Sequence, residues 1–210
     1  IGHNHQGSIE KCKKLFDAAK WAGCNAVKLQ KRHNIGLYSP EFYNAPYENE
    51  NSFGKTYGEH REALEFKWEQ YKELQQYARS LGLTFFATAF DMISADFLAT
   101  LGVPIIKIAS GDHTNTSFLK CAAKIGPGDH SLLLLKCAAR HDIPLIVSTG
   151  GGTEETVKAA VAACNPACIM QCTSGYPADY HELDLRVIET FRKWFPNTVV
   201  GWSGHDTGIA

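Results

Sequence analysis

The sequence predicts an α/β protein, and more specifically an incomplete TIM-type (β/α)8 barrel. Short apolar, β-branched runs that end in polar residues alternate with amphipathic stretches, which is typical of a parallel sheet. No dinucleotide-binding glycine fingerprint follows any of these runs, which favours a barrel over an open doubly wound sheet. Residues 1–5 resemble the tail of a further strand. The chain then supplies about seven of the eight strands of a barrel, and the last strand is missing.

Six further runs are predicted as strands, and their continuous apolar character suits burial on both faces. They are residues 25–30, 84–90, 104–110, 143–150, 168–174 and 198–205. Four stretches are predicted as helices from apolar stripes and end signals. These are residues 8–21 with Ser8 as N-cap, 66–81 before Gly82, 153–163 opening with Thr-Glu-Glu, and 183–195 before Pro196.

Two segments interrupt the alternation. Residues 31–65 form a long polar insertion rich in aromatic residues, predicted as a loop over the catalytic face that acts as a lid. The second is a near-duplication, because residues 111–124 are echoed by 128–140. We therefore predict a duplicated segment at 127–141 that extends or distorts the following helix. The first copy directly follows the strand, which favours Ser110 and Asp112 over Pro127 and Asp129 as site residues.

Composition excludes several classes of function. The formal net charge of the 210 residues is −1, which provides no basic field for nucleic acid. No apolar run reaches the roughly 18 residues that a membrane span needs. The seven cysteines include no CxxC pair. Cys164, Cys168 and Cys172 are spaced by four, but a strand would direct such side chains apart, so reduced thiols in a cytoplasmic protein are expected.

Cationic and hydroxyl side chains gather at the predicted carboxyl ends of the strands, where barrels carry their chemistry. Lys28 and Lys107 lie in apolar strands, and a buried lysine is costly unless it meets an anion. Together with hydroxyls they predict a pocket for a small anion that bears phosphate and carboxylate; the hydroxyls are those of Thr88, Ser110, Ser148, Ser174 and Ser203. Each signal alone has a structural explanation, since strand-end hydroxyls cap helices and lysines reach the surface.

Seven segments carry a resemblance to a known family. They are IGHNHQGS (1–8), AVKLQK (26–31), FGKTYGEHREALEF (53–66), KIASGDHTN (107–115), STG (148–150), QCTSGYPA (171–178) and GWSGHDTGIA (201–210). In these segments, which run in family order over nearly the whole chain, the sequence resembles the sialic acid (N-acylneuraminate) synthases of animal type.

The resemblance implies that phosphoenolpyruvate condenses with N-acetylmannosamine or its 6-phosphate, that phosphate is released, and that a divalent metal, Mn²⁺ or Mg²⁺, takes part. It places Lys28 and Lys107 on phosphoenolpyruvate, and Thr88, Ser110, Ser148 and Ser203 on the phosphate. It makes His205 a metal ligand and directs Gln6, Asp112, Ser174 and Tyr176 towards the sugar or the attacking water. Gln6 stands where many bacterial members carry glutamate, and a neutral amide favours the phosphorylated sugar.

The resemblance also implies that residues 1–210 are the N-terminal barrel domain of a synthase, truncated at both ends. The family's antifreeze-like C-terminal domain and second metal histidine are absent, and full-length members are expected to be homodimers. Little activity is expected from the chain alone, so an inactive fragment or isoform is one alternative. A Schiff-base aldolase is another, because barrels with strand lysines host such enzymes. A metal-dependent hydrolase is suggested by His3-Asn4-His5. Such sites also need histidines at the middle strands, and this sequence has none at those strand ends.

Overall fold

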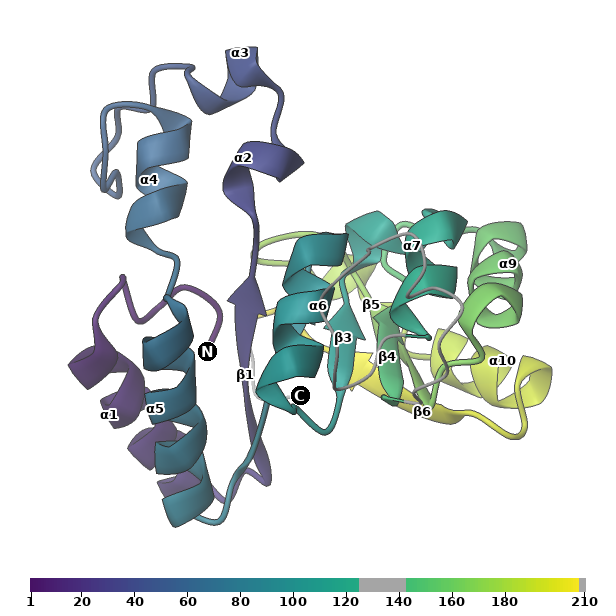
Figure 1. Cartoon of the computed structure of the whole chain (residues 1–210). Coiled ribbons are helices and arrows are strands. Elements are labelled where there is room, and N and C mark those ends of the chain that lie inside the picture. Colours follow the sequence, from purple (N-terminus) through teal and green to yellow (C-terminus); the bar gives the residue numbers. More distant parts are fainter. Residues whose placement is uncertain (125–142, 208–210) are drawn as a thin grey trace. The chain divides into compact units, whose positions relative to one another are not determined.

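The computed structural model of the chain describes residues 1–124 and 143–207. The chain divides into two compact units, Ile1–Pro104 and Ile105–Ala210 (Figure 1). Each unit contains a parallel β ladder whose strands are separated in sequence by helices. This alternation confirms the predicted α/β class, and we describe each unit by itself.

The first unit is built on two parallel strands. β1 (Ala26–Lys31) pairs with β2 (Thr84–Ala89), so that Lys28 lies beside Phe86 and Gln30 beside Thr88. The helices that accompany them are α1 (Ile9–Trp21), α5 (Trp68–Ser80) and α6 (Met92–Leu101). α1 and α5 run side by side (Figure 1) and are joined by an ion pair of 2.6 Å between Lys13 and Glu73.

Local end signals place these helices as predicted. Ser8 caps α1, because its Oγ accepts a hydrogen bond of 3.2 Å from the Lys11 amide. Gly82 follows α5 with a φ of +69°, which suits a glycine after a helix. The sequence prediction missed α6, whose apolar residues form no clear stripe. Asp91 begins this helix by accepting from the Ser94 amide at 2.7 Å.

The insertion after β1 is helical, and its prediction as a loop was wrong. It contains α2 (Asn34–Leu37), α3 (Pro40–Tyr43) and α4 (Tyr57–Ala63). A capping box at Thr56 fixes the start of α4. The helices are short, and aromatic rings hold the segment together. Ring centroids of Tyr57 lie 4.6 Å from Phe42 and 5.3 Å from Tyr47. As predicted, the insertion follows the carboxyl end of β1 (Figure 1).

The opening residues form turns, so their prediction as the tail of a strand was wrong. The amide of Gln6 bonds the carbonyl of His3 at 2.9 Å, and the amide of Ser8 bonds that of His5 at 2.9 Å. Such bonds between residues three apart close turns, and they use amide and carbonyl groups that pairing with a neighbouring strand would need. The described residues therefore hold six strands, where about seven were expected.

The second unit is a parallel ladder of four strands that follow one another in chain order. They are β3 (Ile106–Ile108), β4 (Leu145–Ser148), β5 (Cys168–Cys172) and β6 (Val199–Ser203). The helices are α7 (Thr116–Ala122), α9 (Glu154–Cys164) and α10 (Val187–Trp194), and 3-10 turns occupy Ser110–Asp112 and Tyr180–Glu182. Helix α10 begins four residues later than predicted, since Leu183 has extended backbone.

Apolar packing fixes one face of this ladder against helices. Ile169 of β5 is fully buried against Val157 of α9 and Phe191 of α10. Burying three such side chains contributes several kcal/mol, on the order of 2 kcal/mol each. Because strand side chains alternate, the neighbours of Ile169 along β5 point to the opposite face. That opposite face is therefore available for polar chemistry.

The first copy of the near-duplication follows β3 directly, in agreement with the choice of Ser110 and Asp112. The predicted duplicated segment 127–141 lies outside the described residues, which omit 125–142. Within the described residues, every helix is too short or too polar to cross a membrane.

Candidate active site

Strand register decides which side chains share a face in the second unit. Lys107 lies beside Ile146, and Ser148, two residues further along β4, lies beside Met170. Cys172 then lies beside Ser203. Since paired residues of neighbouring strands point to the same side, Lys107, Ser148 and Ser203 share the face opposite the buried Ile169. Three of the predicted site residues therefore belong to one polar face.

Lys107 is the cation of this face. Its Nζ donates to Ser203 Oγ at 3.3 Å. Burial lowers the pKa of Lys107, while the nearby thiols of Cys172 and Cys168 act in the opposite direction. No carboxylate pairs with Lys107 among residues 1–124 and 143–207. A half-buried ammonium group without a carboxylate is a suitable partner for an anionic ligand.

Ser148 adds an unsatisfied hydroxyl. The residue is 2% exposed, and its Oγ is buried without a hydrogen-bond partner in the described part of the chain. Leaving a buried hydroxyl unpaired costs about 1–3 kcal/mol, so such groups are uncommon in folded proteins. A ligand oxygen would satisfy it, and the role of Ser148 in phosphate binding remains a prediction.

The glycine-rich loop after β4 brings two more predicted residues together. The Gly150 amide donates to Ser110 Oγ at 3.0 Å. A Cβ atom on Gly150 would lie 2.5 Å from Ser174 Oγ and 2.9 Å from Ser110 Oγ. Both serine hydroxyls therefore flank Gly150, and only a residue without a side chain fits between them.

The sequence prediction missed His113, which fixes this loop. The residue is 4% exposed. Its Nδ1 lies 2.6 Å from the carbonyl oxygen of Ser110, and its Nε2 lies 3.1 Å from Thr156 Oγ1 at the start of α9. His113 thus ties Ser110 to the helix that follows the loop. In the sequence, His113 is visible only as a histidine within the motif KIASGDHTN. No sequence pattern indicates that it bonds Ser110 and Thr156.

In the first unit, Lys28 and Thr88 are hydrogen-bonded to each other. Lys28 Nζ donates to Thr88 Oγ1 at 3.0 Å, and Thr88 is 3% exposed. Val27 and Leu29 point to the other side of β1 and are buried. The hydroxyl of Tyr71 on α5 donates to the Gln30 carbonyl at 2.8 Å, which fixes the end of the strand. Alternation again puts the lysine on the face opposite the core.

Both ring nitrogens of His205 have hydrogen-bond partners. Its Nδ1 lies 2.7 Å from the carbonyl oxygen of Thr173. Its Nε2 lies 3.0 Å from the hydroxyl of Tyr176, whose ring stacks on the imidazole at 4.0 Å. A histidine that donates Nδ1–H to a carbonyl keeps its lone pair on Nε2, and here the hydroxyl of Tyr176 occupies that lone pair. Within the described residues, no group of three His, Cys, Asp or Glu side chains accompanies it. His205 could bind a metal through Nε2 only if Tyr176 moved away, so its role as a metal ligand remains a prediction.

Two predicted residues stand apart from these contacts. Gln6 is exposed, and its Oε1 accepts a hydrogen bond from Lys11 on α1. Asp112 ends the 3-10 turn two residues after Ser110 and is half-buried. Their predicted roles towards the sugar or water remain predictions.

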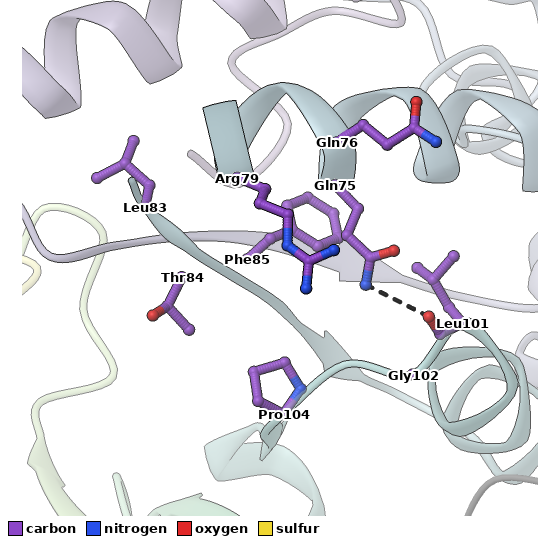
Figure 2. A pocket seen from close by; sticks show the side chains of 9 residues that line it. All are labelled: Gln75, Gln76, Arg79, Leu83, Thr84, Phe85, Leu101, Gly102 and Pro104. Atoms are coloured by element: carbon purple, nitrogen blue, oxygen red, sulfur yellow. Dashed lines mark hydrogen bonds between the residues drawn. The ribbon is translucent and has the colours of Figure 1, made fainter. Parts of the chain in front are cut away.

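A pocket of 540 Å³ lies at the other end of β2. Gln75 and Arg79 of α5 line it together with Thr84, the first residue of β2, and the Gln75 amide donates to the Leu101 carbonyl at 3.3 Å (Figure 2). Thr88 lies at the opposite end of the same strand. Since barrel chemistry occurs at carboxyl strand ends, this pocket is separate from the candidate site.

The buried His5 makes the stability of the first unit sensitive to acid. The residue is 2% exposed, stacks on Phe66 at 4.2 Å, and accepts from the Gly7 amide at 3.0 Å. Burial lowers the pKa of His5 to about 4. Because the unfolded chain binds the proton more tightly, the stabilisation is complete above the unfolded value of about 6.5 and is lost as pH falls towards 4.

We therefore expect the free energy of unfolding to fall by about 2 kcal/mol from His5 between pH 7 and pH 5. Urea unfolding at both pH values measures this. His5→Phe should remove that part of the pH dependence, whereas the exposed His181→Gln should leave it unchanged. An unaltered dependence in His5→Phe would contradict the prediction.

Comparison with known proteins supports the family resemblance that the seven sequence segments indicate. The NeuB family profile matches residues 15–128 and 122–210, so the two matches cover most of the chain and overlap at 122–128, around the junction between the two copies of the near-duplication. The chain belongs to the NeuB family. Relatives that match it include the N-acetylneuraminate-9-phosphate synthases of Mus musculus and Drosophila melanogaster, both 38% identical over 214 residues. The N,N'-diacetyllegionaminic acid synthase of Legionella pneumophila is 34% identical.

The alignment with the mouse relative includes 100% of this NeuB-family chain but only 55% of the relative. It thus spans about half the length of the curated relatives. Among solved structures, N-acetylneuraminic acid synthetase from Leptospira borgpetersenii matches with a TM-score of 0.76 at 24% identity, over 99% of this chain and 64% of that one. A spore coat polysaccharide biosynthesis protein from Bacillus subtilis matches with 0.73 at 27%, over 98% and 51%. These likenesses confirm the predicted fold class, an incomplete barrel.

Proposed function

We propose that this NeuB-family chain provides the anion-binding part of a sialic acid synthase, which condenses phosphoenolpyruvate with N-acetylmannosamine or its 6-phosphate. One observation carries the proposal. On the polar face of the second unit, Lys107 Nζ donates to Ser203 Oγ, and the buried hydroxyl of Ser148 has no partner within the described residues. In the first unit, taken by itself, Lys28 Nζ donates to Thr88 Oγ1. Phosphoenolpyruvate has two anionic groups that such cations would neutralise. The names of the animal relatives favour the 9-phosphate as product.

The proposed reaction joins two carbons and releases phosphate. The methylene carbon of phosphoenolpyruvate forms a bond to the aldehyde carbon of the open-chain sugar, and the aldehyde oxygen takes a proton. Water then adds to the former enol carbon. The bond from that carbon to the phosphate oxygen breaks, which leaves a ketone and inorganic phosphate. Atoms and electrons balance without an oxidant or a reductant.

The residues of the chain would bind and orient the anion. Ser110 Oγ accepts from the Gly150 amide, so its own proton is available to a phosphate oxygen. The unpaired hydroxyl of Ser148 would donate in the same way. Lys28 and Lys107 would neutralise the negative charge that remains on the phosphate as it leaves. Ser174, Tyr176, Asp112 and Gln6 are proposed to serve the sugar or the attacking water.

A metal ligand, a homodimer and a cytoplasmic location are proposed in addition. His205 would supply one ligand to Mn²⁺ or Mg²⁺, and the metal, when bound, would polarise the aldehyde as a Lewis acid. The protein would act as a homodimer. A cytoplasmic location is favoured by the six described cysteines, which are free thiols.

Binding and product formation test the proposal together. Phosphorus NMR of phosphoenolpyruvate with the chain should show saturable line broadening, and mass spectrometry should identify any sialic acid product made with N-acetylmannosamine 6-phosphate. Saturable binding supports the proposed site, and product formation establishes the reaction. Absence of phosphoenolpyruvate binding at millimolar ligand would refute it.

A Schiff-base aldolase is the second candidate, because burial lowers the pKa of Lys107 in the manner of an amine nucleophile. Its signature is covalent. Borohydride reduction in the presence of pyruvate would trap an adduct on Lys107 if the aldolase reading is correct, and mass spectrometry of tryptic peptides would locate it. We expect no adduct, since a synthase of the proposed type uses the lysine as a charge.

A further inference from the structure

The guanidinium of Arg32, just after the carboxyl end of β1, is buried, and its hydrogen-bond partners are neutral. Arg32 is 8% exposed. One of its terminal nitrogens, Nη1, lies 3.0 Å from Gln30 Oε1 and 3.2 Å from His3 Nε2. Its Cζ lies 3.5 Å from the centre of the Phe90 ring. The nearby carboxylate of Glu65 is already ion-paired with Lys31 at 2.9 Å. Among the described residues, Arg32 therefore has no carboxylate ion pair.

A second guanidinium increases the positive charge at this place. Burial is the main cause that lowers the pKa of Arg32 to about 10, and the nearby positive charge of Arg61 on α4 is the second cause. The Nε of Arg61 is buried and has no hydrogen-bond partner within the described residues. His3 adds no charge, because burial and the two arginines lower its pKa to about 3. Glu65 offsets part of this positive charge, but its carboxylate is already paired with Lys31. The two guanidinium groups therefore retain a positive charge that a polyvalent anion would stabilise.

Arg32 continues the polar face of β1. Lys28, Gln30 and Arg32 alternate along the chain with the core residues Val27 and Leu29, and Phe90 extends the same face from Thr88 on β2. Arg32 comes four residues after Lys28, which corresponds to about 13 Å along an extended strand. An open-chain sugar with a phosphate on its last carbon has this length scale. The face thus offers Lys28 near the proposed reacting carbons and Arg32 about 13 Å further along the strand.

We propose that Arg32 and Arg61 bind the phosphate group of the sugar substrate and so select N-acetylmannosamine 6-phosphate over the unphosphorylated sugar. This inference rests on the proposed function and assigns specificity to two residues outside the lysine and serine set. Arg32 offers its planar donor fork, which matches a phosphate, and Arg61 offers an unpaired Nε donor. Gln30 and His3 position the Arg32 guanidinium through the two bonds to Nη1.

Calorimetric titration with N-acetylmannosamine 6-phosphate and with N-acetylmannosamine tests the assignment. In Arg32→Gln and Arg61→Gln, the affinity for the phosphorylated sugar should fall about tenfold to a hundredfold, the effect of losing a charge-assisted hydrogen bond. The affinity for the unphosphorylated sugar should change by less than about twofold. Arg79→Gln is the matched control, because Arg79 lines the pocket at the other end of β2 (Figure 2).

The outcomes separate this inference from the proposed function. An equal loss of affinity for both sugars, or no loss for either, would overturn the assignment of Arg32 and Arg61 to the phosphate. Arg32 would then have a structural role only. Failure of the parent chain to bind phosphoenolpyruvate would instead count against the proposed function. Circular dichroism reports whether Arg32→Gln folds. If it does not, Arg61→Gln decides the matter, because Arg61 is partly exposed and its Nε makes no hydrogen bond that folding would lose.

Discussion

Lys28→Met should weaken phosphoenolpyruvate binding by about a hundredfold, since the variant loses a charge-assisted hydrogen bond in a half-buried position. Methionine keeps the length and apolar stem of the side chain, so the effect isolates the charge. Thr88 Oγ1 then loses the donor that now lies 3.0 Å away. Titration with phosphoenolpyruvate, followed by phosphorus NMR, measures the change.

The matched control is Lys72→Met, because Lys72 is exposed on α5. It should bind phosphoenolpyruvate as the parent chain does. Lys107→Met is expected to resemble Lys28→Met, because Lys107 also donates to a hydroxyl on the polar face. Parent-like affinity in both lysine variants would mean that neither ammonium group contacts the ligand. A loss at Lys107 alone, with a borohydride-trapped adduct, would favour the aldolase.

Gly150→Ala should disrupt the loop after β4. The added Cβ would lie 2.5 Å from Ser174 Oγ, 2.9 Å from Ser110 Oγ and 3.0 Å from the Cys172 carbonyl oxygen. The two serines could turn away, but the carbonyl belongs to β5 and cannot move freely. We expect a loss of about 1–3 kcal/mol in the free energy of unfolding, as for other overpacked sites. Binding of inorganic phosphate should weaken as well, because the serine hydroxyls are displaced.

Gly111→Ala provides the comparison for this substitution. Gly111 lies in the 3-10 turn beside Ser110, and a Cβ there would meet nothing within 4 Å. Urea unfolding should show a change below about 0.5 kcal/mol for Gly111→Ala, as is usual for surface substitutions. If Gly150→Ala proved as stable as Gly111→Ala and bound phosphate unchanged, the close approach of Ser110 and Ser174 to the loop would be wrong.

Much of the fold could be predicted because local signals and tertiary structure agree. Ser8 and Gly82 mark helix ends through their own backbone chemistry, so α1 and α5 appear close to their predicted bounds. The failures have equally local causes. Helix α6 is apolar nearly all round and shows no stripe. In the insertion, aromatic contacts between residues distant in sequence stabilise short helices that propensity alone does not indicate.

For the candidate site, the sequence by itself determined which residue types end each strand. Because the strands are apolar on both faces, the structure was needed to show that Lys28 and Ser148 lie on the face opposite the helices. Only the tertiary structure decided which of them meet. Ser110 and Gly150 are 40 residues apart, and Lys107 and Ser203 are 96 apart. Their contacts depend on strand register, which is set by cooperative packing of helices on the far face and leaves no pattern in a single sequence.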